Sequence, residues 1–144
     1  MYRNYEGYSD PTAGQAVGNL MREYKQQQRA RWRRQYEMKN RPKIYVASKY
    51  AGDVETNTAA AVRYCKHVID QNGIPIASHL LYPQMLDDSK PEERELGLMF
   101  GLSLLAICDE VWCFGDVSES EGVQQEIVEA KKLGKKIRFM KEGF

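Results

Sequence analysis

The stretch Glu110-Val-Trp-Cys-Phe-Gly115, with the run Ser120-Glu-Gly-Val-Gln-Gln-Glu126 shortly after it, decides the fold. The first part is short, apolar and closed by a glycine, which predicts a buried strand. The second part is a polar, glycine-bearing turn that leads into a helix from about Glu121 to Leu133, with Gly134 as its cap. A strand that passes through such a turn into a helix is the repeating unit of parallel α/β proteins.

The same unit recurs on both sides of this stretch. Further strands are predicted over Lys43–Ser48, Ile74–Ser78 and Lys136–Met140, and further helices over about Asp53–Gln71, ended by Asn72-Gly73 with the glycine at the C′ position, and over Glu92–Ile107, opened by Pro91. This alternation predicts a three-layer, flavodoxin-like or Rossmann-like α/β domain with a parallel sheet of about four to five strands. The inward face of the first of these helices is predicted to carry Ala59, Ala60, Val62, Cys65, Val68 and Ile69.

The charges divide the chain into two parts. Residues 1–41 have nine Lys and Arg against four Asp and Glu, whereas residues 42–144 have twelve against sixteen. We therefore predict a basic N-terminal extension over 1–41, irregular over 1–14 and helical from about Ala16 to Met38, followed by the α/β domain over 42–144. The extension fits a solvated or oligomerising helix, and its arginines also fit phosphate contact with a nucleic acid through residues 22–39.

The composition bounds the class of protein. A hydrophobic content of 42% and a charged content of 28% are ordinary for a globular protein. No run of about 18 apolar residues exists, so no membrane span or membrane partner is predicted. The three cysteines show no paired spacing, which favours buried, reduced thiols and a cytoplasmic location. With only two histidines, no metal site is expected.

In a parallel α/β sheet, ligands bind at the carboxyl ends of the strands, and three predicted loops lie there. The first loop holds Ser48, Lys49, Tyr50 and Gly52, a hydroxyl, an ammonium and a glycine that could cradle a phosphate. It is neither a Walker A loop nor a GxGxxG loop. An ordinary strand–helix turn, capped by Asp53, explains the same residues.

The second and third loops add further candidates. His79 ends the second predicted strand and faces the expected pocket. Ser120 could donate to an anion, Gly122 allows close backbone approach, and Glu126 lies one helical turn further on. A carboxylate at that place can act as a nucleophile or a general base. A merely solvated glutamate is the alternative, with Glu119, Glu121 and Glu129 as rivals, and Asp109 is interpreted as a turn residue.

Residues from about 43 to 140 resemble the nucleoside 2-deoxyribosyltransferase-like superfamily, in particular its small phage and bacterial members. The resemblance rests on IYVASKYAGD (44–53), IASHLLYPQMLDD (76–88), and LLAICDEVWCFG (104–115) followed by SEGVQQE (120–126). It implies that Glu126 attacks C1′ of a sugar and that Ser120, two residues before Gly122, holds the phosphate of a nucleoside 5′-monophosphate. It also implies a homo-oligomer and no organic or metal cofactor. Two positions depart from the family pattern. Val128 stands where a glycine is usual, which implies altered packing over the helix. Lys49-Tyr50 is the second departure.

Taken together, the residues and the resemblance predict an enzyme of N-glycosidic bonds. It would cleave or transfer a nucleoside or nucleoside 5′-monophosphate, as a glycosidase (hydrolase) or a transferase, with Glu126 as the catalytic residue. The substrate would be held by Ser48, Lys49, Tyr50, Gly52, His79, Ser120 and Gly122. Two alternatives stay open: a non-catalytic nucleotide-binding module that senses or sequesters its ligand, and a nucleic-acid-associated protein that uses the basic arm.

Overall fold

The computed structural model describes residues 11–141 of the chain. The described chain divides into two compact units at the junction of Asn40 and Arg41. The first ten residues, predicted to be irregular, lie outside the described residues. No helix in the described part of the chain combines the length and the apolar character that crossing a bilayer requires.

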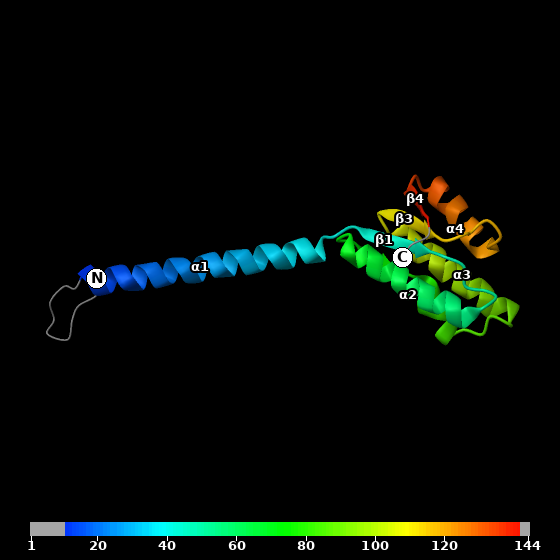
Figure 1. Cartoon of the computed structure of the whole chain (residues 1–144), viewed down its shortest axis with the longest axis horizontal. Helices are drawn as coiled ribbons and strands as arrows, with labels where there is room; N and C mark the ends of the chain where they lie inside the picture. The colour runs from blue at the N-terminus through cyan, green and yellow to red at the C-terminus, as the bar shows by residue number, and fades with distance from the viewer. Residues whose placement is uncertain (1–10, 142–144) are drawn as a thin grey trace. The chain divides into compact units, whose positions relative to one another are not determined.

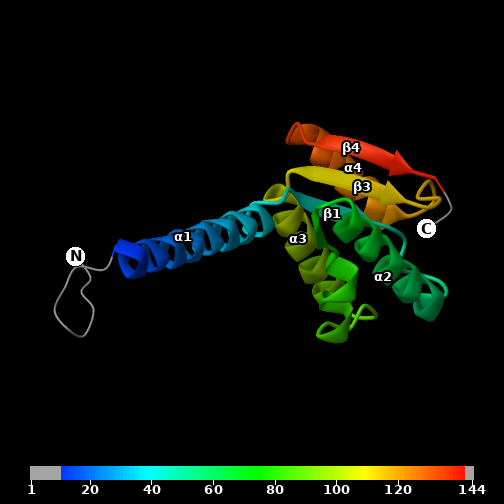
Figure 2. The same ribbon diagram turned by 60° about the vertical axis from the view of Figure 1, so that its left-hand side comes forward.

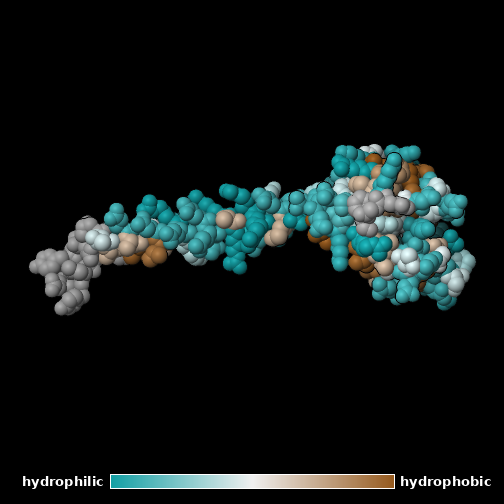
Figure 3. Space-filling view, viewed as in Figure 1, coloured by the Kyte–Doolittle hydropathy of each residue, from teal (hydrophilic) through white to brown (hydrophobic). Residues whose placement is uncertain are grey.

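The described part of the N-terminal unit forms one helix, α1, which spans Pro11–Lys39. The prediction that residues 11–14 are irregular is wrong, because the proline has a fixed φ that suits the first position of a helix. The side chain of Asn40 closes the other end by donating to the Tyr36 carbonyl at 2.8 Å. In Figure 3 hydrophobic side chains gather toward the N-terminal end of α1, and hydrophilic ones cover most of the rest.

The second unit is an α/β domain with one parallel sheet. Its strands are β1 Lys43–Ala47, β2 Ile74–Ile76, β3 Glu110–Phe114 and β4 Lys136–Met140; its helices are α2 Val54–Asp70, α3 Pro91–Ala106 and α4 Glu121–Lys132; and two short 3₁₀ turns, η1 Ser78–Leu80 and η2 Tyr82–Gln84, follow β2. The strand order is β2-β1-β3-β4, and every pair is parallel. Figures 1 and 2 show β1, β3 and β4 side by side. The predicted fold class is confirmed.

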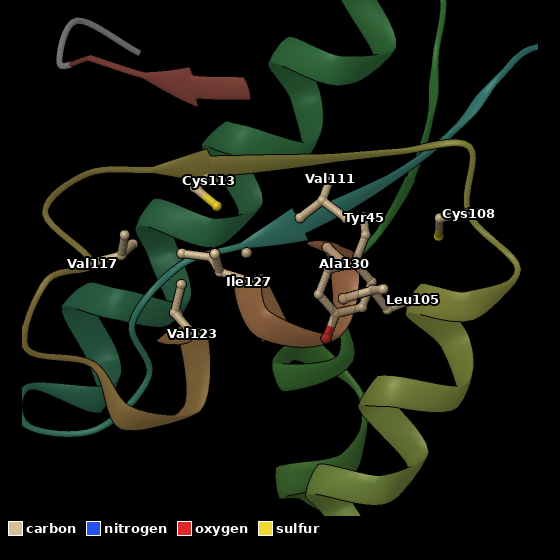
Figure 4. Close-up of a cluster of buried hydrophobic side chains, with 10 residues drawn as sticks. Tyr45, Leu105, Cys108, Val111, Cys113, Val117, Val123, Ile127 and Ala130 are labelled. Carbon is tan, nitrogen blue, oxygen red and sulfur yellow. The ribbon is translucent and has the colours of Figure 1, made fainter. Parts of the chain in front are cut away.

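Alternate residues of the two central strands point to opposite layers. Ile44 and Val46 of β1 join Phe114 of β3 in a buried cluster with Val68 of α2. On the other face, Figure 4 shows residues of β1 and β3 packed against α3 and α4, and this cluster includes Tyr45, Leu105, Val111, Cys113, Val123, Ile127 and Ala130. Both faces of the central strands are therefore covered, as a parallel sheet requires.

The inward face of α2 differs from the prediction. Asn57, Ala61 and Val68 are its buried residues, whereas Ala59, Val62 and Ile69 are exposed. Apolar residues occur on several sides of this helix, so periodicity alone did not fix its rotation. The amide of Asn57 fixes it instead, because it donates to the carbonyls of Tyr50 and Ala51 at 3.1 and 3.0 Å.

Two end structures also differ in detail. Asn72, not Gly73, adopts the left-handed conformation after α2, with φ of 61°. β2 ends at Ile76 rather than Ser78, because Ser78 begins the 3₁₀ turn η1. The predicted cap at Gly134 is present, with φ of 69°. Asp109 is a turn residue as expected, and its carboxylate accepts from the Lys43 backbone N–H at 2.7 Å.

A candidate active site at the carboxyl ends of the strands

A cavity of about 930 Å³ opens where β1, β2 and β3 end. Its walls come from the loop after β1, the 3₁₀ turns after β2, the N-terminal half of α3, and the loop that leads from β3 into α4. These include the three loops that the sequence predicted to meet. Among the predicted site residues, the walls include Ser48, Lys49, Tyr50, His79, Ser120, Gly122 and Glu126.

Glu126 faces this cavity from the second turn of α4. The helix is fixed by Val123, Ile127 and Ala130, which are buried against the sheet. Glu126 lies next to Ile127 in the chain, so its side chain emerges at the border between the core and the cavity. Glu126 is partly buried, and it is one of the residues that line the cavity.

A buried hydroxyl pair holds the Glu126 carboxylate. Tyr45 donates to Glu126 Oε1 at 3.0 Å, and the Tyr45 oxygen lies 2.7 Å from Ser78 Oγ. Helix α3 approaches this pair at Gly101, where a Cβ atom would lie 3.1 Å from Ser78 Oγ and 3.2 Å from the Tyr45 hydroxyl. A larger residue at Gly101 would therefore push α3 away from the pair.

The surroundings change the protonation of both partners. Burial raises the pKa of Glu126 from 4.5 to about 7, although the hydrogen bond from Tyr45 lowers it. Burial, followed by the nearby Glu126, raises the pKa of Tyr45 well above its usual value. Tyr45 therefore stays a hydrogen-bond donor at neutral pH, and Glu126 is divided between its acid and its carboxylate form.

This shift predicts a pH-dependent gain in stability on replacing Glu126 by Gln. Because the pKa of the folded state lies above the value of 4.5 in the unfolded chain, the folded state binds the proton more tightly. The resulting stability is fully present below pH 4.5 and is lost as the pH rises through about 7. At pH 8 we expect Glu126→Gln to be more stable than wild type by on the order of 2 kcal/mol, with little difference near pH 4.

Thermal unfolding at pH 4, 6 and 8 measures this effect. The matched control is Glu119→Gln, which removes an exposed carboxylate of the same cavity. A difference between Glu126→Gln and wild type that stays constant over this pH range would contradict the assigned environment of Glu126.

A second hydrogen-bonded pair lies on the β1 and β2 side of the cavity. Ser48 Oγ is 3.1 Å from His79 Nε2, and the rings of His79 and Tyr50 are 6.3 Å apart between centroids. Burial lowers the pKa of His79 to about 4, so its imidazole is neutral at physiological pH. The pair thus offers neutral hydrogen-bonding groups to a ligand.

The first loop is shaped by caps and by one buried amide. Asp53 caps α2, accepting from the Thr56 backbone N–H at 3.2 Å and from its hydroxyl at 2.7 Å. The ordinary-turn explanation is therefore correct for Asp53. Gly52 has φ of 98° and supports the turn; it is not among the described residues that line the cavity, unlike its neighbour Ala51.

The third loop brings the start of α4 to the cavity. Ser120 is the N-cap, and its hydroxyl accepts from the Val123 N–H over 3.4 Å. Gly122 has open space around the position of a Cβ atom. Gln124 fixes the preceding loop by donating to the Val117 carbonyl at 2.9 Å. Val128, expected to change the packing over this helix, is instead 64% exposed.

Metal-ligating groups and thiols are the other chemistry-bearing side chains of the described residues. No group of three or more His, Cys, Asp or Glu in residues 11–141 is placed to hold a metal ion. Cys108 and Cys113 are buried as predicted, and Cys65 is partly buried. Burial raises the pKa of Cys113 to about 12 and that of Cys65 and Cys108 to about 11, which suppresses the reactive thiolate.

Comparison with known proteins places the chain in a family. Residues 42–140 match the family described as a domain of unknown function (DUF7768). The chain is a member of the DUF7768 family. No curated protein matches the chain.

A solved structure shares the fold of this DUF7768 domain. It belongs to a 2-deoxyribosyltransferase from the psychrotolerant bacterium Bacillus psychrosaccharolyticus, with a TM-score of 0.57 and 17% sequence identity. The similarity covers 69% of this chain and 72% of that one. At this identity it establishes a distant relationship of fold.

Sequence reasoning missed three residues that organise the site. Tyr45 and Ser78 were assigned to strands, and Asn57 to a helix with no stated role. A signal was present for Tyr45, since a tyrosine inside an otherwise aliphatic strand needs a partner for its hydroxyl. The identity of that partner depends on packing between residues 81 positions apart in the chain.

Proposed function

We propose that this protein cleaves or transfers at the N-glycosidic bond of a nucleoside or nucleoside 5′-monophosphate, with Glu126 as the nucleophile. The observation that carries the proposal is the Glu126 carboxylate itself, held by Tyr45 and facing a cavity at the carboxyl ends of the strands. The shared fold with a 2-deoxyribosyltransferase supports the same chemistry.

The chemistry follows from the position of the carboxylate. An oxygen of ionised Glu126 attacks C1′ while the bond from C1′ to the base breaks, and the electron pair leaves with the base nitrogen. The base of an uncharged nucleoside departs as an anion and takes a proton from solvent. Water or a second base then attacks C1′ of the glycosyl ester and releases Glu126 as the carboxylate; the proton lost by the attacking water or by the ring N–H of the second base goes to solvent.

Other residues of the cavity fit the remaining tasks. Tyr45 orients Glu126 and stabilises its negative form by donating a hydrogen bond. Ser48 and His79 offer neutral polar groups to the sugar or the base, and Tyr50 lies beside them. Ser120 and the backbone at Gly122 are the candidates for contact with a 5′-substituent of the sugar.

The test is an incubation of purified protein with a pool of nucleosides, 2′-deoxynucleosides and their 5′-monophosphates, followed by chromatography for free base. Base release that disappears in Glu126→Gln supports the proposal. Tight binding of a pool member without any product would instead favour the non-catalytic binding module.

A second candidate function concerns α1. Its basic side chains include Arg29, Arg31, Arg33 and Arg34, and Trp32 beside them is 74% exposed. Exposed cations together with an aromatic ring suit a nucleic-acid backbone and its bases. We therefore expect the triple variant Arg31→Glu/Arg33→Glu/Arg34→Glu to lose most retention of RNA or DNA at low salt.

Retention and sedimentation of the full chain are measured together for this variant. The control is Arg63→Glu/Lys66→Glu, which changes exposed charges on α2. A changed sedimentation coefficient with unchanged nucleic-acid retention would assign α1 to self-association instead.

A further inference from the structure

The charged residues in the walls of the cavity are predominantly acidic. Besides Glu126, its lining includes Asp88, Glu93, Glu95, Asp116, Glu119 and Glu121. The cationic residues of the lining are Lys49 and Arg94. His79 adds no positive charge at neutral pH, because burial lowers its pKa to about 4. A ligand in this cavity therefore meets an excess of negative charge.

Both cations interact with acidic residues of the same walls. Arg94 Nη2 lies 3.9 Å from Glu121 Oε2, which links α3 to α4 across the cavity. Hydrogen bonds from Ser118 hold the pKa of Asp116 below its usual range, and the positive charge of Lys49 lowers it further. Glu93 is 3.7 Å from Lys90, which lies outside the lining. These contacts leave the cavity a poor place for a phosphate dianion.

We propose that the substrate is an unphosphorylated nucleoside whose base carries a positive charge. The inference rests on the proposed N-glycosidic chemistry and narrows its substrate class. The negative charge of the lining disfavours the 5′-monophosphate, because two negative charges would enter an acidic cavity. The same charge favours a positively charged base, such as an N-glycosylated pyridinium ring or a ring-alkylated purine.

The chemical step gains from such a substrate. As the bond from C1′ to the base breaks, its electron pair neutralises the positive ring, so the base leaves without needing a proton. At the same time a bond forms from Glu126 to C1′, and the negative carboxylate becomes a neutral ester. A pair of opposite charges thus disappears in a partly desolvated cavity, where water stabilises the separated charges less than in bulk.

A charge series with one type of glycosidic bond tests this inference. The probes are nicotinamide riboside, nicotinic acid riboside and nicotinamide mononucleotide, each made with ribose and with 2-deoxyribose. Their pyridinium bond is shared, and their net charge falls from positive through neutral to negative. We expect kcat/KM to fall about tenfold at each step at low salt, and the steps to shrink at 0.5 M salt as screening increases.

Matched variants then locate the source of the preference. Glu95→Gln/Glu119→Gln removes two exposed carboxylates of the lining, and Glu92→Gln/Glu129→Gln removes two carboxylates that are not part of it. The first variant should reduce the preference for the positive probe several-fold, and the second should leave it unchanged. An equal loss in both variants would overturn the assignment to the cavity walls.

The remaining outcomes distinguish a failure of this inference from a failure of the proposed function on which it rests. Glu126-dependent base release from neutral nucleosides, with a flat or reversed charge series, overturns the inference and leaves the proposed function standing. No base release from any neutral or charged nucleoside overturns both.

Discussion

Replacing Glu126 by glutamine is expected to reduce base release by more than about 10³-fold for every nucleoside that the wild-type protein accepts. Such a loss corresponds to about 4 kcal/mol of transition-state stabilisation. Glutamine keeps the shape of the side chain and an oxygen that can accept from Tyr45 at the same place. It lacks the negative charge that attacks C1′ and forms the ester in the proposed mechanism, so we expect the chemical step to be lost while the cavity is kept.

Single-turnover chromatography for free base measures the effect, and ligand binding is measured beside it. The matched control is Glu129→Gln, which lies on the same helix and outside the cavity lining. We expect the Glu126→Gln variant to bind substrate within a few-fold of wild type and the control to retain its turnover. Full turnover in Glu126→Gln would remove Glu126 from the mechanism.

Replacing Phe114 by alanine is expected to destabilise the α/β domain by about 3–5 kcal/mol. Phe114 is only 1% exposed, and its ring stacks on Tyr64 with centroids 4.6 Å apart and planes 10° apart. Trp112 lies 6.5 Å away between ring centroids. Truncation would therefore leave a cavity between the sheet and α2 and remove an aromatic contact.

Urea or thermal unfolding measures this loss. Domains of this size are stable by about 5–15 kcal/mol, so the loss is a large part of the total. Phe139→Ala on β4 is the matched control, because Phe139 is 63% exposed and its truncation should cost less than about 1 kcal/mol. Similar losses for the two variants would show that the layer between α2 and the sheet is not a packed core.

The alternation of strands and helices was predictable because each element carries its own local pattern. The strand Glu110–Phe114 and the helix after Pro91 are examples, since apolar runs and a helix-starting proline act over a few residues. The rotation of α2 was not predictable from its apolar residues, because a polar residue, Asn57, decides it. Local signals determine where helices and strands form, and contacts between them determine which face of each is buried.

The same distinction holds for the candidate site. Glu126 reaches the cavity because it lies one helical turn beyond the turn that joins β3 to α4, and these features are local. Its hydroxyl partners, Tyr45 and Ser78, come from distant parts of the chain and meet it only through tertiary packing. Gly52 shows the reverse case, in which a residue near the site serves the turn and lies outside the lining.

Glu126, the proposed nucleophile, and the segment after β2 have different tolerances to change. Glu126 stands on a helix whose neighbouring side chains are buried in the core. The segment of η1 and η2 lines the cavity through Ser78, His79, Tyr82 and Pro83, and of these only Ser78 is classed as buried. We expect substitutions at the partly buried Tyr82 and Pro83 to alter the cavity at a smaller cost in stability than substitutions at Ser78, which is hydrogen-bonded to Tyr45. Under the proposed function, ligand preference can change at these positions while Glu126 on α4 is kept, and the segment is the natural place to begin engineering a new preference.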